Sequence, residues 1–174
     1  ARPLDELLMS RGFATFFHHL KWWRGAAPYD SPATSLRVRQ ALPEDAPAWA
    51  ALASRVFDWS PEHAVWTSRV IGRQGWWHGF ALDHDTPVAL AAVYVHDGLA
   101  WLRFAGTLES HRRRGAQSAL LAARIAHARA EGVRFMTLET APDWPDVPGE
   151  SLRNAARAGF LPAYERPSWI WPVG

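Results

Sequence analysis

The sequence contains no cysteine, and this absence excludes several kinds of site at once. Without thiols the chain has no disulfide framework, no thiolate metal site and no cysteine nucleophile. No apolar run approaches the roughly 20 residues that span a bilayer, and the first residues do not have the pattern of a signal peptide. We therefore expect a cytoplasmic protein that does not associate with membranes.

A strong excess of charge is also missing. The formal net charge is +2, and charged residues make up 21% of the 174 positions. This balance is typical of a globular domain with a real core and does not predict a nucleic-acid partner. The basic residues do cluster locally at 112–114, which favours a small anion-binding site.

Tryptophan is unusually frequent, with 11 residues scattered along the chain. Most of them are expected to pack in the core or at its edge. The alternative is an aromatic pocket for an acceptor molecule. Trp76, Trp77 and Trp144 are the better candidates for such a pocket, because they lie beside predicted loops.

The first 35 residues predict a helix–strand extension followed by a linker. Residues 1–11 carry leucines on one face of an amphipathic helix that Gly12 ends. Residues 13–23 are aromatic and predict a strand, and 25–35 are rich in proline, glycine, serine and alanine. We therefore separate 1–35 from a main domain over 36–174.

The main domain is predicted to be α+β with a mixed sheet, in the order β-α-α-β-β-β-α-β-α-β. The expected elements are a strand at 36–39, a helix from Pro43, a helix over 61–72, strands at 78–83, 88–96 and 99–107, a helix over 115–131, a strand at 133–139, a helix over 150–158 and a terminal hairpin or two short strands over 160–172.

The chain also contains a weak internal repeat. Gly12-Phe13 and Gly159-Phe160 each follow a predicted helix and precede an aromatic strand. The repeat can be a chance match in an aromatic-rich chain. Alternatively, residues 1–24 are the tail of a preceding, similar domain.

The segment 107–121 carries the clearest functional pattern. A predicted strand leads into a tight basic loop, Arg112-Arg113-Arg114-Gly115, and the loop leads into a helix. Unpaired amides at a helix N-terminus favour anions, glycine allows close approach of the backbone, and arginines add forked donors. A phosphate site is predicted, although a solvated arginine run before a surface helix would have the same composition.

This segment resembles motif A of the GNAT superfamily of acyl-CoA-dependent N-acyltransferases, written Q/R-x-x-G-x-G/A. Arg112 matches the first position and Gly115 the glycine, whereas Gln117 departs from the small final residue. Ala158-Gly159-Phe160 resembles motif B, and the resemblance covers about 36–172. It implies a GNAT-like fold, with the chain as the C-terminal part of a tandem or extended member as one option.

The resemblance implies acetyl-CoA as co-substrate and a primary amine, on a small molecule or a peptide, as acceptor. Backbone groups at the strand end would pair with the pantetheine arm like an added strand, and the basic loop would hold the pyrophosphate, with two of its three arginines on phosphate oxygens. The implied cofactor-binding residues are Ala105, Gly106, Thr107, Arg112, Arg113, Arg114, Gly115, Ala116, Gln117, Ser118 and Asn154.

Two positions depart from the family pattern. Ala155 stands where the family often has a tyrosine that acts as general acid, and Pro148 stands where an asparagine is common, with Asn154 nearby in another register. Tyr164 is our first substitute for the acid. Ser110 and Ser151 are lower alternatives.

For the general base we favour Glu139, which ends an apolar strand where the acyl group is expected. Its carboxylate would take a proton from the amine directly or through water, and partial burial is expected to raise its pKa. A solvated strand-end glutamate is the alternative, and Glu109 is a second candidate. We expect no metal site, because His18 and His19 point to opposite faces of a strand and the sequence has no HxxxH or HExxH motif.

Three functions stay open at this stage. The first is an active N-acetyltransferase. The second is a non-catalytic acyl-CoA-binding or regulatory domain, since the usual tyrosine is missing. The third is a polyanion binder that uses the arginine run. Aromatic strands at 13–23 and 160–171 make strand exchange or a homodimer a further expectation.

Overall fold

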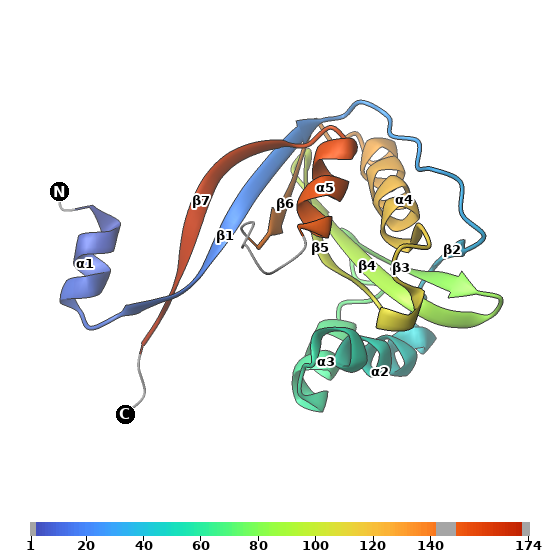
Figure 1. The fold of residues 1–174 in the computed structure, drawn as a ribbon, viewed down its shortest axis with the longest axis horizontal. Coiled ribbons are helices and arrows are strands. Elements are labelled where there is room, and N and C mark those ends of the chain that lie inside the picture. Colours follow the sequence, from blue (N-terminus) through green and yellow to red (C-terminus); the bar gives the residue numbers. More distant parts are fainter. Residues whose placement is uncertain (1–2, 142–148, 172–174) are drawn as a thin grey trace.

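A computed structural model describes residues 3–141 and 149–171 of the chain. The predicted α+β class and the predicted order of elements are confirmed (Figure 1). The elements are α1 (Leu4–Ser10), β1 (Ala14–Gly25), β2 (Arg37–Gln40), a 3-10 turn (Pro43–Asp45), α2 (Ala46–Phe57), α3 (Pro61–Ser68), β3 (Trp76–Asp83), β4 (Thr86–His96), β5 (Leu99–Thr107), a second 3-10 turn (Glu109–His111), α4 (Ala116–Ala130), β6 (Phe135–Thr140), α5 (Glu150–Arg157) and β7 (Leu161–Ile170).

The strands form one mixed sheet in the order β2-β3-β4-β5-β6-β1-β7. Its neighbouring strands are antiparallel except for β5 and β6, which are parallel. Helices α2 and α3 cover one face and α4 and α5 cover the other (Figure 1). None of the helices in the described part of the chain is long and apolar enough to cross a membrane.

Strand β4 lies at the centre of the two-sided core. Ala89, Ala91 and Val93 belong to the apolar cluster that includes α4, while Leu90 and Ala92 belong to the cluster that includes α2. Both faces of this strand are covered, so its sequence is a continuous apolar run rather than an alternating one.

Strand β1 lies inside the sheet, between β6 and β7. Lys21 pairs with Glu139 on one side and with Tyr164 on the other. This arrangement corrects our expectation for 160–172, because the segment is one strand that pairs with β1 rather than a hairpin or two short strands. The helix expected over 61–72 also ends earlier, at Ser68, and turns fill the chain up to β3.

The outer halves of β1 and β7 leave the body of the protein as a two-stranded ribbon that carries α1 at its end (Figure 1). Phe16 on this ribbon is 72% exposed, and α1 buries no residue. Helices α1 and α5 end in the same way: Phe13 N donates to Leu8 O at 3.1 Å, and Phe160 N donates to Ala155 O at 3.0 Å. The two halves of the internal repeat therefore share their local structure.

A buried histidine lies in the α2 side of the core. His78 on β3 is 1% exposed, and its ring contacts those of Trp49 at 4.7 Å and Trp76 at 5.4 Å. Neither ring nitrogen has a hydrogen-bond partner among the described residues. Burial lowers the pKa of His78 from 6.5 to about 4, because the apolar surroundings disfavour the charged ring.

Acid should therefore destabilise this protein through His78. Between pH 6.5 and about 4 the unfolded chain binds a proton at this histidine and the folded chain does not, so stability falls as the pH falls through this window. The full loss is on the order of 3 kcal/mol. Urea unfolding at pH 7.5, 6 and 5 measures how the unfolding free energy falls through this window.

His78→Leu should remove this part of the pH dependence, whereas His96→Leu, at an exposed position, should keep it. Equal slopes of unfolding free energy against pH in wild type and His78→Leu would show that another group is responsible.

Candidate active site

The basic loop connects β5 to α4 through a short 3-10 turn, Glu109–His111. Gly115 precedes the helix with φ of 86° and provides no side-chain cap, so the first amides of α4 point outward without an intrahelical acceptor. Arg113 also has a positive φ, 61°. The loop thus turns sharply enough to bring arginine side chains beside the open end of the helix.

The linker packs directly on this loop. Thr34 Oγ1 donates to the carbonyl oxygen of Arg114 at 2.6 Å. A Cβ atom on Gly115 would lie 2.9 Å from the Cβ of Thr34, so this approach requires glycine. The linker therefore forms one wall of the site.

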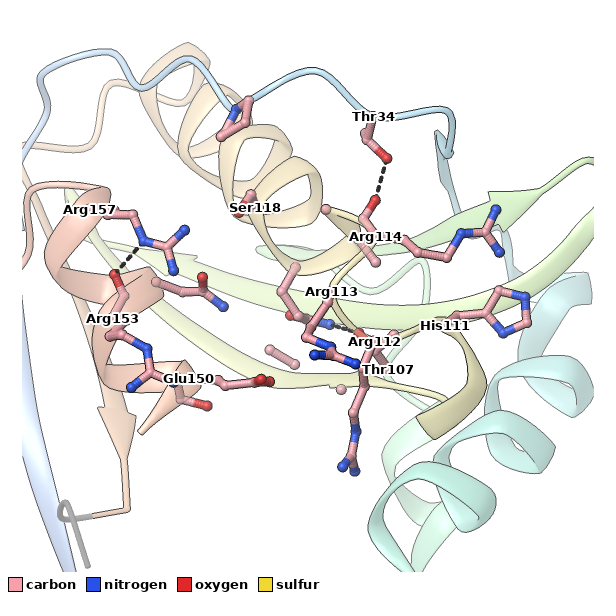
Figure 2. A pocket seen from close by; sticks show the side chains of 18 of the residues that line it. Thr34, Thr107, His111, Arg112, Arg113, Arg114, Ser118, Glu150, Arg153 and Arg157 are labelled. Carbon is pink, nitrogen blue, oxygen red and sulfur yellow. Dashed lines mark hydrogen bonds between the residues drawn. The ribbon is translucent and has the colours of Figure 1, made fainter. Parts of the chain in front are cut away.

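A cavity of about 1010 Å³ opens above the loop (Figure 2). All eleven residues that the sequence predicts as cofactor-binding line it, and so do linker residues and the exposed face of α5. The lining residues are Pro32–Ser35, Val56, Phe57, Ala105–Thr107, His111–Ser118, Glu150, Ser151, Arg153, Asn154 and Arg157. We call this space the outer cavity.

The three arginines of the loop are not equivalent. Arg114 Nη1 donates to Asp83 Oδ2 at 2.7 Å, and this hydrogen bond lowers the pKa of Asp83. In Figure 2 the side chain of Arg114 points away from the middle of the cavity, whereas that of Arg113 lies inside it. Arg112 and Arg113 are thus available to bind an anion.

Gln117, which departs from the family motif, has a structural task. Its Nε2 donates to Thr107 Oγ1 at 2.8 Å, and this bond ties the first turn of α4 to the end of β5 (Figure 2). Thr107 thus provides a hydrogen-bond partner for the longer side chain at this position.

Strands β5 and β6 separate beside this loop. Their parallel pairing runs from Leu99 to Leu102 on β5 and stops there. Phe104 then adopts a φ of 52°, and the pairing of β5 with β4 shifts register at the same place. The β6-facing backbone groups of β5 beyond Leu102 are left without a strand partner and can pair with an extended ligand.

A second, inner cavity of about 140 Å³ occupies the gap between these strands. It shares Ala105, Gln117, Ser151 and Asn154 with the outer cavity, so the two are neighbours. Its other lining residues are Leu102, Arg103, Phe104, Leu121, Arg124, Leu138, Glu139, Thr140 and Ala155.

Glu139 lines the inner cavity, where the sequence places the general base. Its Oε1 forms ion pairs with Lys21 Nζ and, at 3.0 Å, with Arg166 Nη2. Burial raises the pKa of Glu139, but the hydrogen bond and charge of Lys21, with the charges of Arg166 and His19, outweigh it. The pKa therefore lies below its usual value, and our expectation of a raised pKa is wrong.

The other acid and base candidates lie in different places. Tyr164 shares a sheet face with Lys21 and Glu139, but it is 58% exposed and lines neither cavity. Ser151 lines both cavities, whereas Ser110 bonds to His111 Nδ1 at 2.8 Å. Glu109 lines neither cavity. Ala155 is buried in the core.

The aromatic pocket is not formed by the two adjacent tryptophans. Trp76 packs against His78 and Tyr94, and Trp77 is 7% exposed in the core beside α4. Trp144 and Pro148 lie outside the described residues. The structure supports the packing interpretation for Trp76 and Trp77.

Sequence reasoning missed the basic residues that α5, β1 and β7 contribute, as well as Arg103 and Arg124 in the inner cavity. Arg153 and Arg157 are four apart on α5, a helical spacing that places both on one face and was visible in the sequence. Lys21 and Arg166 belong to β1 and β7 and reach Glu139 through strand pairing, for which the sequence gives no local signal.

The contact between the linker and the loop predicts a difference between two alanine substitutions. Gly115 and Gly132 both have positive φ, 86° and 72°, but only at Gly115 does an added Cβ meet another residue. Gly132→Ala should lower the unfolding free energy by about 1 kcal/mol through backbone strain alone. Gly115→Ala should lose clearly more in urea unfolding, because Thr34 must move. Equal losses would mean that the linker does not pack on the loop.

Comparison with known proteins agrees with this geometry. The profile described as Acetyltransferase (GNAT) family matches residues 37–146. No curated protein matches the sequence significantly.

Three solved structures illustrate the similarity in fold. A GCN5-related N-acetyltransferase from Kribbella flavida is 21% identical, with a TM-score of 0.69 over 98% of this chain and 64% of its own. Another from Sphaerobacter thermophilus is 19% identical, with a TM-score of 0.73 over 97% of this chain and 56% of its own. The aminoglycoside N-acetyltransferase AAC(6')-Iy, in complex with a CoA bisubstrate analogue, is 19% identical, with a TM-score of 0.62 over 74% of this chain and 92% of its own.

The chain thus spans less than two thirds of the length of the first two of these proteins. The match over more than half of this chain, the strand–loop–helix around Gly115 and the shared fold lead to one conclusion: the chain belongs to the GNAT family of acetyltransferases.

Proposed function

We propose that this protein is an N-acetyltransferase that transfers an acetyl group from acetyl-CoA to a primary amine on a small molecule or a peptide. One observation carries the proposal: the eleven residues that resemblance assigns to the cofactor all line a single cavity, which adjoins a smaller one that holds Glu139. A binding groove thus lies next to a candidate base.

The residues of the outer cavity fit acetyl-CoA. The open amides of α4, with Arg112 and Arg113, suit the pyrophosphate. Arg153 and Arg157 supply two further cations for a phosphate. Gly106 also lines this cavity. A Cβ there would lie 2.1 Å from Cγ1 of Val56, so glycine allows the end of β5 to lie close to α2.

Transfer to an amine requires that the amine lose a proton. The carboxylate of Glu139 is ionised at neutral pH, since its pKa is lowered, and it lies at the gap between β5 and β6. It can accept the proton directly or through water. Unpaired backbone amides of β5 are suited to stabilise the oxyanion of the transfer.

The proton that the departing sulfur needs has two candidate donors. Tyr164 is our first proposal, on the same sheet face as Glu139. Ser151 is the alternative, because its position between the two cavities is closer to the gap.

A non-catalytic acyl-CoA-binding domain is the second candidate. Two observations favour it: Ala155 occupies the place of the usual tyrosine inside the core, and Glu139 is held by two cations that lower its affinity for a proton. This domain would bind acyl-CoA as proposed above and release no CoA with any amine.

Acetyl-CoA at 1 mM should raise the melting temperature of the wild-type protein by several degrees, because binding to the folded state adds stability by mass action. Arg113→Glu should weaken binding at least about tenfold, since it places an anion in the phosphate site. Arg55→Glu is the matched control on the exposed face of α2, outside both cavities. An unchanged wild-type melting temperature would contradict acetyl-CoA binding.

Glu139→Gln should reduce CoA release with an accepted amine by about 100-fold or more, the usual contribution of a general base. The dissociation constant of acetyl-CoA, measured by calorimetry, should change little, so the loss should fall on kcat. A panel of amines with wild type separates the two candidate functions: binding without CoA release from any amine favours the non-catalytic domain.

A further inference from the structure

The inner cavity contains a buried arginine that the proposed reaction does not use. Arg124 lies on α4, on the same helical face as Gln117 and Leu121, and all three line this cavity. Only 4% of its surface is exposed. A buried guanidinium therefore lies at the wall of this cavity, beside the gap between β5 and β6.

Arg124 lacks the partners that a structural arginine has. In the described part of the chain its hydrogen bond runs from Nε to Leu120 O, at 3.2 Å and within its own helix, and no carboxylate pairs with it. Arg24 provides the comparison: it is equally buried, at 5%, yet its guanidinium donates to the carbonyl oxygens of Gly25, Ala27, Pro28 and Ala158.

An unpaired buried cation is costly, and an apolar side chain of similar size would fill the same place without this cost. Burial lowers the pKa of Arg124 to about 9, a measure of the same cost. Its Nε already donates to Leu120 O, so its two terminal amino groups remain to donate hydrogen bonds into the cavity. Two parallel donors on a rigid fork match the two oxygens of one carboxylate.

The other charged groups of the cavity do not neutralise Arg124. Arg103 lines the same cavity, half-buried, with its guanidinium 3.8 Å from the centre of the Trp101 ring and no carboxylate bound to it among the described residues. Glu139 is already paired with Lys21 and Arg166. The inner cavity therefore has an excess of positive charge.

We propose that the inner cavity binds a carboxylate and that Arg124 is the residue that binds it. This inference rests on the proposed function, since the inner cavity adjoins the groove assigned to acetyl-CoA. The carboxylate has two sources in an acyl transfer: an acyl group that ends in a carboxylate, such as succinyl, or an acceptor amine that also carries a carboxylate, such as an amino acid. Either source would neutralise Arg124 in the loaded protein.

The donor is tested first, without any acceptor. Dissociation constants of succinyl-CoA and acetyl-CoA are measured by calorimetry with wild type. If the carboxylate belongs to the donor, succinyl-CoA should bind about 10- to 100-fold more tightly, as expected of a charge-assisted hydrogen bond in a buried site.

The acceptor is tested with acetyl-CoA as donor. CoA release is measured with a panel of amino acids and with the matching carboxamides, in which a neutral amide of similar size replaces the carboxylate. If the carboxylate belongs to the acceptor, the amino acids should have kcat/KM values about tenfold or more above those of their carboxamides.

Three variants test whether Arg124 causes the preference for a carboxylate. Arg124→Met keeps an unbranched apolar side chain without the charge and should bring the preferred ratio close to one, while Arg124→Lys, which keeps the charge but loses the fork, should retain part of it. Arg55→Met, which lines neither cavity, should leave the ratio as in wild type. Melting curves show whether each variant is folded, and the wild-type ratios stand on their own if Arg124→Met does not fold.

Ratios near one for wild type in both tests would overturn the proposal. A succinyl-CoA to acetyl-CoA ratio near one would also overturn it if no amino acid is acetylated. A preference that survives Arg124→Met would overturn the role of Arg124. If acetyl-CoA binds and neutral amines are acetylated without any carboxylate preference, this inference fails alone. If no acyl-CoA binds, the proposed function fails with it.

Discussion

The separation of β5 and β6 is the constraint on which the rest of the site depends. The two strands are parallel and pair only as far as Leu102 and Leu138, after which Phe104 turns β5 away from the ladder. A sheet that stayed paired would have closed the inner cavity and satisfied its own backbone groups. Because it opens here, the amides of β5, the first turn of α4 and Glu139 all face one continuous region.

Local sequence signals predicted the loop that lines the outer cavity, whereas nonlocal strand pairing sets the direction of the pKa shift of Glu139. The run from Arg112 to Ser118 was predictable because a strand, a glycine turn and a helix start are encoded by neighbouring residues. The sign of the pKa shift of Glu139 was not, because it depends on Lys21, which lies more than a hundred positions away and reaches Glu139 through strand register. The sequence shows that β1 is a strand but not where it joins the sheet.

Charge is distributed unevenly along the two cavities. The outer cavity faces solvent, so its arginines can stay hydrated until an anion arrives, and one of them, Arg114, is occupied by Asp83. Arg124 at the inner cavity is buried and has no carboxylate partner among the described residues, so it bears a desolvation cost that a partner would relieve. Arg24 shows that this fold surrounds a purely structural buried arginine with carbonyl oxygens.

The position of β1 has a consequence for how the chain folds. This strand is made before the rest of the sheet, yet it sits between β6 and β7, whose residues follow it by more than a hundred positions. It cannot complete its ladder until nearly the whole chain has emerged, and such long-range pairing is slow because large loops must close first. During that wait the edges of β1 stay unpaired, so synthesis of this protein includes a period in which chaperones or wrong partners compete with β6 and β7 for this strand.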